Sequence, residues 1–253
     1  HFKQSFIIHN PVEEYSIAQN ILHMLRADSS FTALEAEILD LILLIHAEHG
    51  GGNNSTFTSH VVSSTGTDTY SSVSASIGSL KGPLHGGANC MVSNMIEDIK
   101  KNCSYTNEEF LKEYIRKIFM GEAFDRSGKV YGMGHAIYTL SDPRAVILKK
   151  KAYELAKEKG QLEEFELFSN VEKFTKEIGK ELKGENFEIC ANVDLYSGFV
   201  YKLLNIPTNI FTPLFALARI ASWNAHRIEQ ITSDKKIIRP AYKAIDVHGK
   251  LLT

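Results

Sequence analysis

The chain has 253 residues, of which 43% are hydrophobic and 23% are charged, and its formal net charge at pH 7 is −2. This composition is typical of a globular chain with enough apolar residues for one large domain or two smaller ones. We expect no nucleic-acid or membrane partner, because the chain has no basic block and no apolar run long enough to span a bilayer.

The N-terminal part predicts two helices. The chain begins at His1 without an initiator Met or a signal peptide, so we expect that an upstream segment has been removed. Asn10 followed by Pro11 predicts the start of a first helix. Thr32 and Glu35 have the spacing of a capping box and predict the start of a second helix, which runs to a glycine-rich turn.

Two histidines flank glycine turns in the stretch 46–88. His49 follows the predicted C-terminal end of the second helix, where the helix dipole favours a protonated ring. His85 lies between glycines just before another apolar-periodic segment, where a helix N-terminus would favour a neutral ring. The sequence therefore predicts one histidine biased towards charge and one biased towards neutrality, and simple capping or packing roles stay open for both.

The stretch Thr56–Ser79 is ambiguous. Its Ser, Thr and Val content resembles that of a strand, but from Tyr70 and Val73 onward the apolar residues recur at the helical spacings of three and four. We interpret it as helical, with small residues that allow close packing. Further on, Thr106 with Glu109 predicts the cap of another helix.

Residues 121–138 form a glycine-rich connection that ends near His135. Gly132-Met133-Gly134 has no preceding strand and no third glycine, so we reject a nucleotide-binding fingerprint. Asp142-Pro143 then predicts a new helix start, with the charges over 149–183 on solvated helix surface.

Two charged residues stand out near the end of the chain. Asp194 follows a short apolar run, so it is either a helix N-cap or a base held out of water. Arg219 lies within an apolar helix predicted over 211–231, and it needs a partner, either a buried carboxylate or a ligand. Together with three glycine-flanked histidines, these residues favour enolisation next to a thioester or ketone.

The cysteines, Cys90, Cys103 and Cys190, are scattered, so we expect reduced thiols in an intracellular protein.

Five motifs occur in the order found in citrate synthases: HAEHGGGNNSTFTS, GSLKGPLHGGAN, GMGHAIYTLSDPR, NVDLYSG and LFALARIASW…IIRP. The chain resembles that family over nearly its whole length. The resemblance implies an all-α enzyme whose large helical domain comprises residues 1–87 and 202–253, with a smaller inserted domain at 88–201. It also implies that a further helical section precedes this chain in complete members.

The resemblance implies a role for each matching residue. His85 would hydrogen-bond the thioester carbonyl of acetyl-CoA, Asp194 would take its methyl proton, and His135 would polarise the ketone of oxaloacetate. His49, Arg144 and Arg219 would bind oxaloacetate, Phe215 would pack near the reacting centre, and Arg239 would reach the site of a partner subunit. The residues expected to border CoA are Lys129, Val130, Tyr131, Gly132, Met133 and Gly134.

These assignments imply an acyltransferase that makes citrate and CoA. We expect a cytoplasmic homodimer with CoA as co-substrate, no resident cofactor and no metal. 2-Methylcitrate synthases, which use propionyl-CoA, carry the same residues, and a non-catalytic homologue is a further alternative. A metal-dependent hydrolase built on His46 and His49 is disfavoured, because the chain has no HExxH motif and no third ligand at a helical offset.

Overall fold

The computed structural model describes residues 7–83, 85–135, 137–233 and 236–241. Its helices are α1 (Ile17–Leu25), α2 (Ala33–His46), α3 (Asn54–Ser63), α4 (Thr69–Leu80), α5 (Ala88–Asn102), α6 (Glu108–Phe119), α7 (Pro143–Glu158), α8 (Leu162–Lys183), α9 (Val193–Leu203), the short 3-10 helix η1 (Thr208–Ile210) and α10 (Phe211–Ser233). Within these residues there is no β-strand, which agrees with the predicted all-α class. No helix in this part of the chain is long and apolar enough to cross a bilayer.

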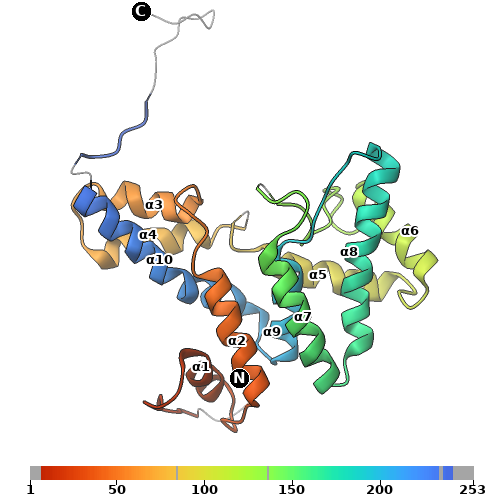
Figure 1. Ribbon diagram of the computed structural model, residues 1–253, viewed down its shortest axis with the longest axis horizontal. Helices are drawn as coiled ribbons and strands as arrows, with labels where there is room; N and C mark the ends of the chain where they lie inside the picture. Colours follow the sequence, from red (N-terminus) through yellow and green to blue (C-terminus); the bar gives the residue numbers. More distant parts are fainter. Residues whose placement is uncertain (1–6, 84, 136, 234–235, 242–253) are drawn as a thin grey trace, which may run out of the picture.

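The helices pack in two groups (Figure 1). In one group α3 and α4 pack against each other and against α10, and α2 packs on both α1 and α10. In the other group α5 and α7 pack on α9, and α6 and α7 pack on α8. Helix α2 also contacts α7, so it joins the two groups. We retain the division into residues 1–87 with 202–253 and residues 88–201 as a proposal. Residues 1–6, 84, 136, 234–235 and 242–253 of those ranges lie outside the described chain.

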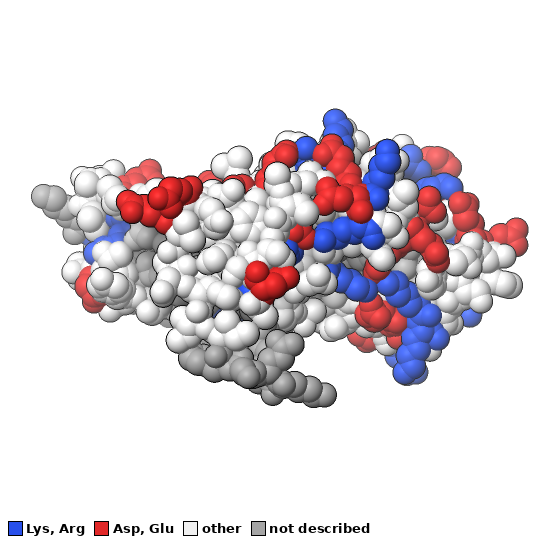
Figure 2. Space-filling view, turned by 90° about the horizontal axis from the view of Figure 1, so that it is seen from below, with Lys and Arg blue, Asp and Glu red and all other residues white. Residues whose placement is uncertain are grey.

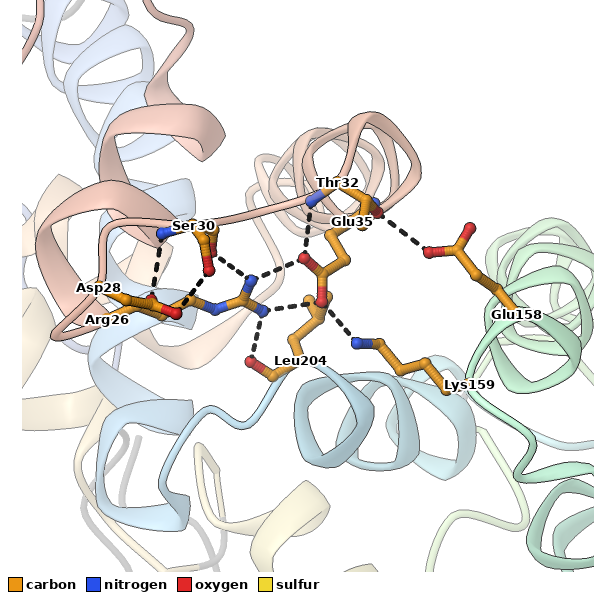
Figure 3. A network of polar contacts seen from close by, with 8 residues as sticks. All are labelled: Arg26, Asp28, Ser30, Thr32, Glu35, Glu158, Lys159 and Leu204. Carbon is orange, nitrogen blue, oxygen red and sulfur yellow. Dashed lines mark hydrogen bonds and ion pairs between the residues drawn. The ribbon is translucent and has the colours of Figure 1, made fainter.

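A charged network ties α1 and α2 to the ends of α7 and α9 (Figure 3). The buried carboxylate of Glu35 on α2 accepts hydrogen bonds from both terminal nitrogens of Arg26, at 2.6 and 2.9 Å, and from Lys159 Nζ at 2.6 Å. Arg26 also donates to the carbonyl oxygen of Leu204, just beyond α9, at 2.9 Å. One buried anion therefore contacts the C-terminal end of α7 directly and the end of α9 through Arg26.

Some helix starts follow the sequence signals and others do not. The capping box of Thr32 and Glu35 is present at α2, and Asp142 caps α7 with Pro143 in its first turn. The start predicted at Asn10 is wrong. The first helix begins after Ser16, because the side chain of Asn20 bonds both the backbone N–H and the carbonyl of Val12 and holds that segment in a turn.

Two further predictions needed correction. The cap of α6 is Asn107, whose side chain accepts two backbone N–H groups, and not Thr106. The stretch Thr56–Ser79 is helical as predicted, but it forms parts of two helices. The chain turns at Gly66, which has φ +78°, and α4 restarts under an Asp68 cap.

Candidate active site

The turn after α2 is held by Glu48. Its Oε1 accepts the backbone N–H of His49 at 2.6 Å and also that of Gly50, which has φ +83°. The ring of His49 stacks on that of His135, with the ring centroids 5.5 Å apart. The prediction that His49 is biased towards charge is wrong, because burial and the nearby Arg144 lower its pKa.

His135 has a fixed tautomer. Its Nδ1 accepts the backbone N–H groups of Ile137 and Tyr138, at 3.0 and 3.1 Å, so the proton of the neutral ring lies on Nε2. Burial, and then Arg144, lower its pKa and keep the ring neutral. Arg144 Nη2 lies 3.2 Å from that Nε2, so two N–H donors are close together without an acceptor between them.

The orientation of Arg144 depends on Asp142, which is buried. Its Oδ1 caps α7 by accepting the backbone N–H of Arg144, and its two carboxylate oxygens also accept the side-chain Nε at 3.0 Å and Nη2 at 2.8 Å. The sequence analysis identified Asp142 only as a cap. The adjacent Arg144 was the available signal for its second role.

Arg219, on α10, has no solvent exposure. Its Nε donates to the backbone carbonyl of His46 at 2.7 Å, whereas its Nη1 and Nη2 have no hydrogen-bond partner. Among the described residues no carboxylate forms an ion pair with it, so the partner that the sequence required is not a protein carboxylate there. Burial lowers the pKa of Arg219 to about 10, which still leaves it charged at neutral pH.

His46, which the sequence analysis weighed only as a ligand of a disfavoured metal site, lies beside Arg219. It is 1% exposed, its Nδ1 donates to the carbonyl of Ile42 at 2.8 Å, and its Nε2 has no partner. Burial lowers its pKa to about 4, so the ring is neutral. Its edge contacts the ring of Phe215, with the centroids 5.0 Å apart, and this aromatic also lies under Arg219. The signal available in the sequence was its position at the end of an apolar helix.

His85 lies just before α5. Its Nε2 is 3.2 Å from Asn53 Oδ1 and 3.1 Å from Ser55 Oγ, and the same Oγ accepts the indole N–H of Trp223 at 3.2 Å. The predicted neutral bias has the right direction, but burial is the main reason that its pKa is lowered, followed by the charge of Arg219. The adjacent Gly86 is required, because a Cβ there would lie 2.3 Å from the carbonyl oxygen of Leu80.

Asp194 is not the N-cap of α9. That cap is Asn192, whose side chain accepts the backbone N–H of Asp194 at 3.0 Å. Burial raises the pKa of Asp194 to about 6, partly offset by Arg144. Of the two alternatives from the sequence, the N-cap is therefore wrong, and the role of base stays a prediction.

The loop 129–134 is attached to the start of α9. Asn192 donates from its backbone to the carbonyl of Gly132 at 2.9 Å and from its side chain to that of Gly134 at 2.8 Å. At Gly132, which has φ +82°, a Cβ would lie 2.9 Å from Leu195 Cα. A cavity of about 280 Å³ lies along this loop, with Lys129, Tyr131, Lys183 and Phe187 among its lining residues.

These groups influence one another electrostatically. Arg219 lowers the pKa of His85 and His49, and both Arg144 and Arg219 act on Asp194. Residues from α7, α9, α10 and the segments before α3, α5 and α7 therefore lie within electrostatic range of one another. Arg239 does not join them. It is exposed beyond α10, where the neighbouring Ile238 N–H donates to Ser64 at the end of α3.

Comparison with known proteins decides the family. The sequence model described as "Citrate synthase, C-terminal domain" matches residues 2–241. The chain belongs to the citrate synthase family. It is 40% identical over 240 residues to the citrate synthase of Synechocystis sp., covering 94% of this chain and 55% of the relative. It is 35% identical over 240 residues to the 2-methylcitrate synthase of Shewanella oneidensis, covering 95% of this chain and 58% of that relative.

Solved citrate synthases have the same fold. The Pyrobaculum aerophilum enzyme aligns with a TM-score of 0.79 at 32% identity, covering 98% of this chain and 57% of that chain. The Thermoplasma acidophilum enzyme, solved as a ternary complex with carboxymethyl coenzyme A and oxaloacetate, aligns with a TM-score of 0.73 at 28% identity, covering 94% of this chain and 61% of that chain. The chain thus spans little more than half the length of these citrate synthase relatives.

Proposed function

We propose that the protein containing this chain condenses acetyl-CoA with oxaloacetate and water to give citrate and free CoA. The observation that carries the proposal is Arg219, a fully buried guanidinium with two unpartnered nitrogens. A desolvated guanidinium pairs best with a carboxylate that accepts two parallel hydrogen bonds. Oxaloacetate offers two carboxylates, and Arg144 is the second cation of the site. The complex of the Thermoplasma relative with oxaloacetate supports this substrate.

The ketone of oxaloacetate requires a hydrogen-bond donor. His135 supplies its Nε2–H in a fixed tautomer, because two backbone N–H groups occupy Nδ1. The hydrogen bond from this N–H to the ketone oxygen strengthens as negative charge develops on that oxygen during carbon–carbon bond formation. His49, stacked on His135 and neutral, lines the same subsite.

The methyl group of acetyl-CoA is a very weak acid, so its deprotonation requires a base and a donor acting together. Asp194, whose pKa is raised to about 6 by burial, is ionised at neutral pH and is a stronger base than an ordinary aspartate. His85 stabilises the enolate oxygen as a neutral donor. In the structure its Nε2 lies 3.2 Å from Asn53 Oδ1 and 3.1 Å from Ser55 Oγ, whose own hydrogen is donated to that Oδ1, so Nε2 carries the ring proton. Binding of the thioester therefore has to turn this N–H to the carbonyl oxygen or transfer the ring proton to Nδ1.

The rest of the reaction follows from these placements. The enol carbon attacks the ketone carbon to form citryl-CoA, and water then hydrolyses the thioester to release citrate and CoA. CoA would lie along the cavity beside residues 129–134, where Lys129 and Lys183 can meet its phosphates. This chemistry uses side chains alone, so we expect no metal at the reacting centre and no resident cofactor.

The experiment is an assay of the full-length polypeptide with oxaloacetate and an acyl-CoA, following thiol release. Release that requires both substrates supports the proposal, and its absence in a folded protein contradicts it. A non-catalytic homologue would have been free to lose His85, Asp194 or the arginines, yet all are present.

The likeness to a 2-methylcitrate synthase makes propionyl-CoA the second candidate for the acyl-CoA substrate. One methylene group in a pocket changes the binding free energy of the transition state by only about 1–3 kcal/mol, so both acyl-CoAs could react. Their kcat/KM values should therefore be compared.

We also propose a homodimer. Large apolar side chains are exposed on α3 and α4, namely Phe57, Tyr70 and Ile77. Figure 2 shows that charged side chains gather over the half of the molecule that contains α5–α9, while much of the other half is uncharged on this face. A stable interface would bury more than roughly 2,000 Å². Arg239, exposed on the segment beyond α10, would then contribute to the neighbouring subunit's site. Analytical sedimentation tests the dimer.

The free cysteines Cys90, Cys103 and Cys190 agree with a reducing compartment, and we propose that the protein is cytoplasmic. Subcellular fractionation of the full-length protein tests this location. Recovery in an oxidising compartment would contradict it.

A further inference from the structure

A second cluster of ligating side chains lies between α3 and α10, outside the residues proposed for the reaction. His60 Nε2 on α3 lies 3.1 Å from His226 Nδ1 on α10. The carboxylate of Glu229, one turn further along α10, has its Oε2 3.5 Å from the same His226 Nδ1. The three ligand atoms all lie within 4.8 Å of one another.

The outer nitrogens of both rings face acceptors. His60 Nδ1 is 2.9 Å from Gln230 Oε1, and His226 Nε2 is 3.1 Å from Glu48 Oε2. An amide carbonyl and a carboxylate accept hydrogen bonds and donate none, so each outer nitrogen carries a proton. In a neutral ring the inner nitrogen is then unprotonated. Two lone pairs therefore face each other across 3.1 Å.

A cation between the rings would relieve this repulsion. Two lone pairs at hydrogen-bond distance repel unless a proton or a metal ion lies between them. Two carboxylates, Glu48 and Glu229, also contact His226. Across the described part of the chain neither forms an ion pair with a lysine or arginine, so the cluster has an excess of negative charge that a divalent ion would balance.

We propose that His60, His226 and Glu229 bind a divalent transition-metal ion of the zinc type, with water as the fourth ligand. Zn–N bonds of about 2.0–2.1 Å in a tetrahedral site place two ligand nitrogens about 3.3 Å apart, close to the observed separation. Histidine ligands characteristically donate their other N–H to a fixed oxygen. Gln230 and Glu48 provide that oxygen here.

The site adjoins the reacting centre without belonging to it. The other oxygen of Glu48 accepts the backbone N–H of His49 at 2.6 Å, so one carboxylate connects the metal ligand His226 with the turn that carries His49. The proposal departs from the expectation that the chain holds no metal. Its test measures metal binding and not turnover, so its failure is distinguishable from failure of the proposed reaction.

The experiment titrates the metal-free 253-residue chain with Co²⁺ and follows the visible absorption of tetrahedral cobalt, with Zn²⁺ added last. We expect one Co²⁺ per chain, displaced by Zn²⁺. Glu229→Gln, His60→Gln and His226→Gln should each weaken Co²⁺ binding at least tenfold. Glu48→Gln should weaken it by about 10- to 100-fold, the usual effect of losing an outer-shell partner. His23→Gln, on α1, is the matched control and should bind as the parent chain does.

Glu229→Gln should leave the fold intact, because the Glu229 side chain is 66% exposed, so weaker Co²⁺ binding in this variant reports loss of a ligand. Equal Co²⁺ affinity in this variant and in the control would overturn the proposal. A ¹⁵N spectrum that shows one of the two rings protonated on both nitrogens in excess Zn²⁺ would also overturn it, since the shared cation would then be a proton.

Discussion

The guanidinium of Arg219 stacks on the ring of Phe215, with Cζ 4.7 Å from the ring centroid. Its Nε is fixed by a 2.7 Å hydrogen bond to the carbonyl of His46. Phe215 contacts one face of the planar guanidinium and the hydrogen bond holds its Nε edge, so the group keeps a single orientation. The two terminal nitrogens are therefore presented together, ready for a carboxylate.

Arg219→Lys should weaken oxaloacetate binding roughly 10- to 100-fold, because an ammonium keeps the charge but loses the paired geometry and a charge-assisted hydrogen bond worth about 1.5–3 kcal/mol. Calorimetric titration of the full-length protein measures this. Arg126→Lys, at an exposed position, is the control. Unchanged affinity in Arg219→Lys would refute the carboxylate assignment.

Asp194→Asn or His85→Ala should abolish turnover and leave oxaloacetate binding nearly intact, since both residues are assigned to the acyl-CoA carbon acid. General acid–base catalysis contributes on the order of 10²-fold or more. Steady-state kinetics and oxaloacetate titration on the same preparations separate the two effects. A variant that keeps more than about a tenth of the wild-type kcat would rule out the assigned role.

Turnover should also fall at low pH. Asp194 acts as a base only when ionised, and burial raises its pKa to about 6. We expect kcat/KM for the acyl-CoA to decline about tenfold per pH unit below that value, because this pKa belongs to the unliganded site. A pH–rate profile of the full-length enzyme checks this. A decline that begins only near pH 4 would mean that the carboxyl group of Asp194 titrates like an exposed one.

The same pKa shift affects stability. The pKa of Asp194 is about 6 in the folded chain against an ordinary value of 3.8, so between these values the folded state binds more protons and its stability decreases as pH rises. Asp194→Asn removes this penalty. Its Tm should exceed that of the parent chain at pH 7.5, and the difference should shrink towards pH 4. A lower Tm for the variant at pH 7.5 would contradict this.

Glu35→Gln should destabilise the chain by about 3 kcal/mol, because it breaks a buried ion-pair network and leaves Arg26 without its counter-ion. Burial alone would raise the pKa of Glu35, but hydrogen bonds from Arg26 and Lys159 lower it to about 2. The stabilisation is therefore complete above pH 4.5 and is lost as pH falls towards 2.

Urea unfolding at pH 7 and at pH 3 measures this effect. Glu37→Gln is the matched control, because the Glu37 side chain is 59% exposed and pairs with Lys151 at the surface. Equal losses in the two variants would mean that the network of Figure 3 does not stabilise the fold.

Subunit mixing tests the proposed dimer. Arg239→Ala and Asp194→Asn subunits are each inactive in our assignment, but a mixed dimer holds one site in which both residues are intact. Mixing full-length variants should therefore restore activity. If subunit exchange is demonstrated and no activity returns, Arg239 does not serve the neighbouring site.

Local signals in the sequence predicted much of the fold. The capping box at Thr32 and the Asp142-Pro143 start both hold, because each cap is satisfied by residues of its own turn. The Asn10 prediction failed for the opposite reason. The backbone of that segment bonds the side chain of Asn20, and no local rule places that partner.

Prediction of the site had the same limit. The motifs identified His49, His135 and Arg219, but the neutrality of His49 results from burial and from Arg144, which the chain order does not reveal. His46 was weighed only as a metal ligand, because its unpartnered Nε2 becomes apparent only in the folded chain, where its carbonyl accepts a hydrogen bond from Arg219 on α10.

The backbone contacts of Gly132 affect how the loop 129–134 and α9 can move. Its backbone lies against Leu195, the residue after Asp194, and it accepts the N–H of Asn192, the residue that caps α9. These contacts fix the proposed CoA loop to the start of α9, the helix that carries the proposed base Asp194. Any rotation of α9 relative to α10 would move the proposed CoA loop and Asp194 together, so the distance between them would stay the same.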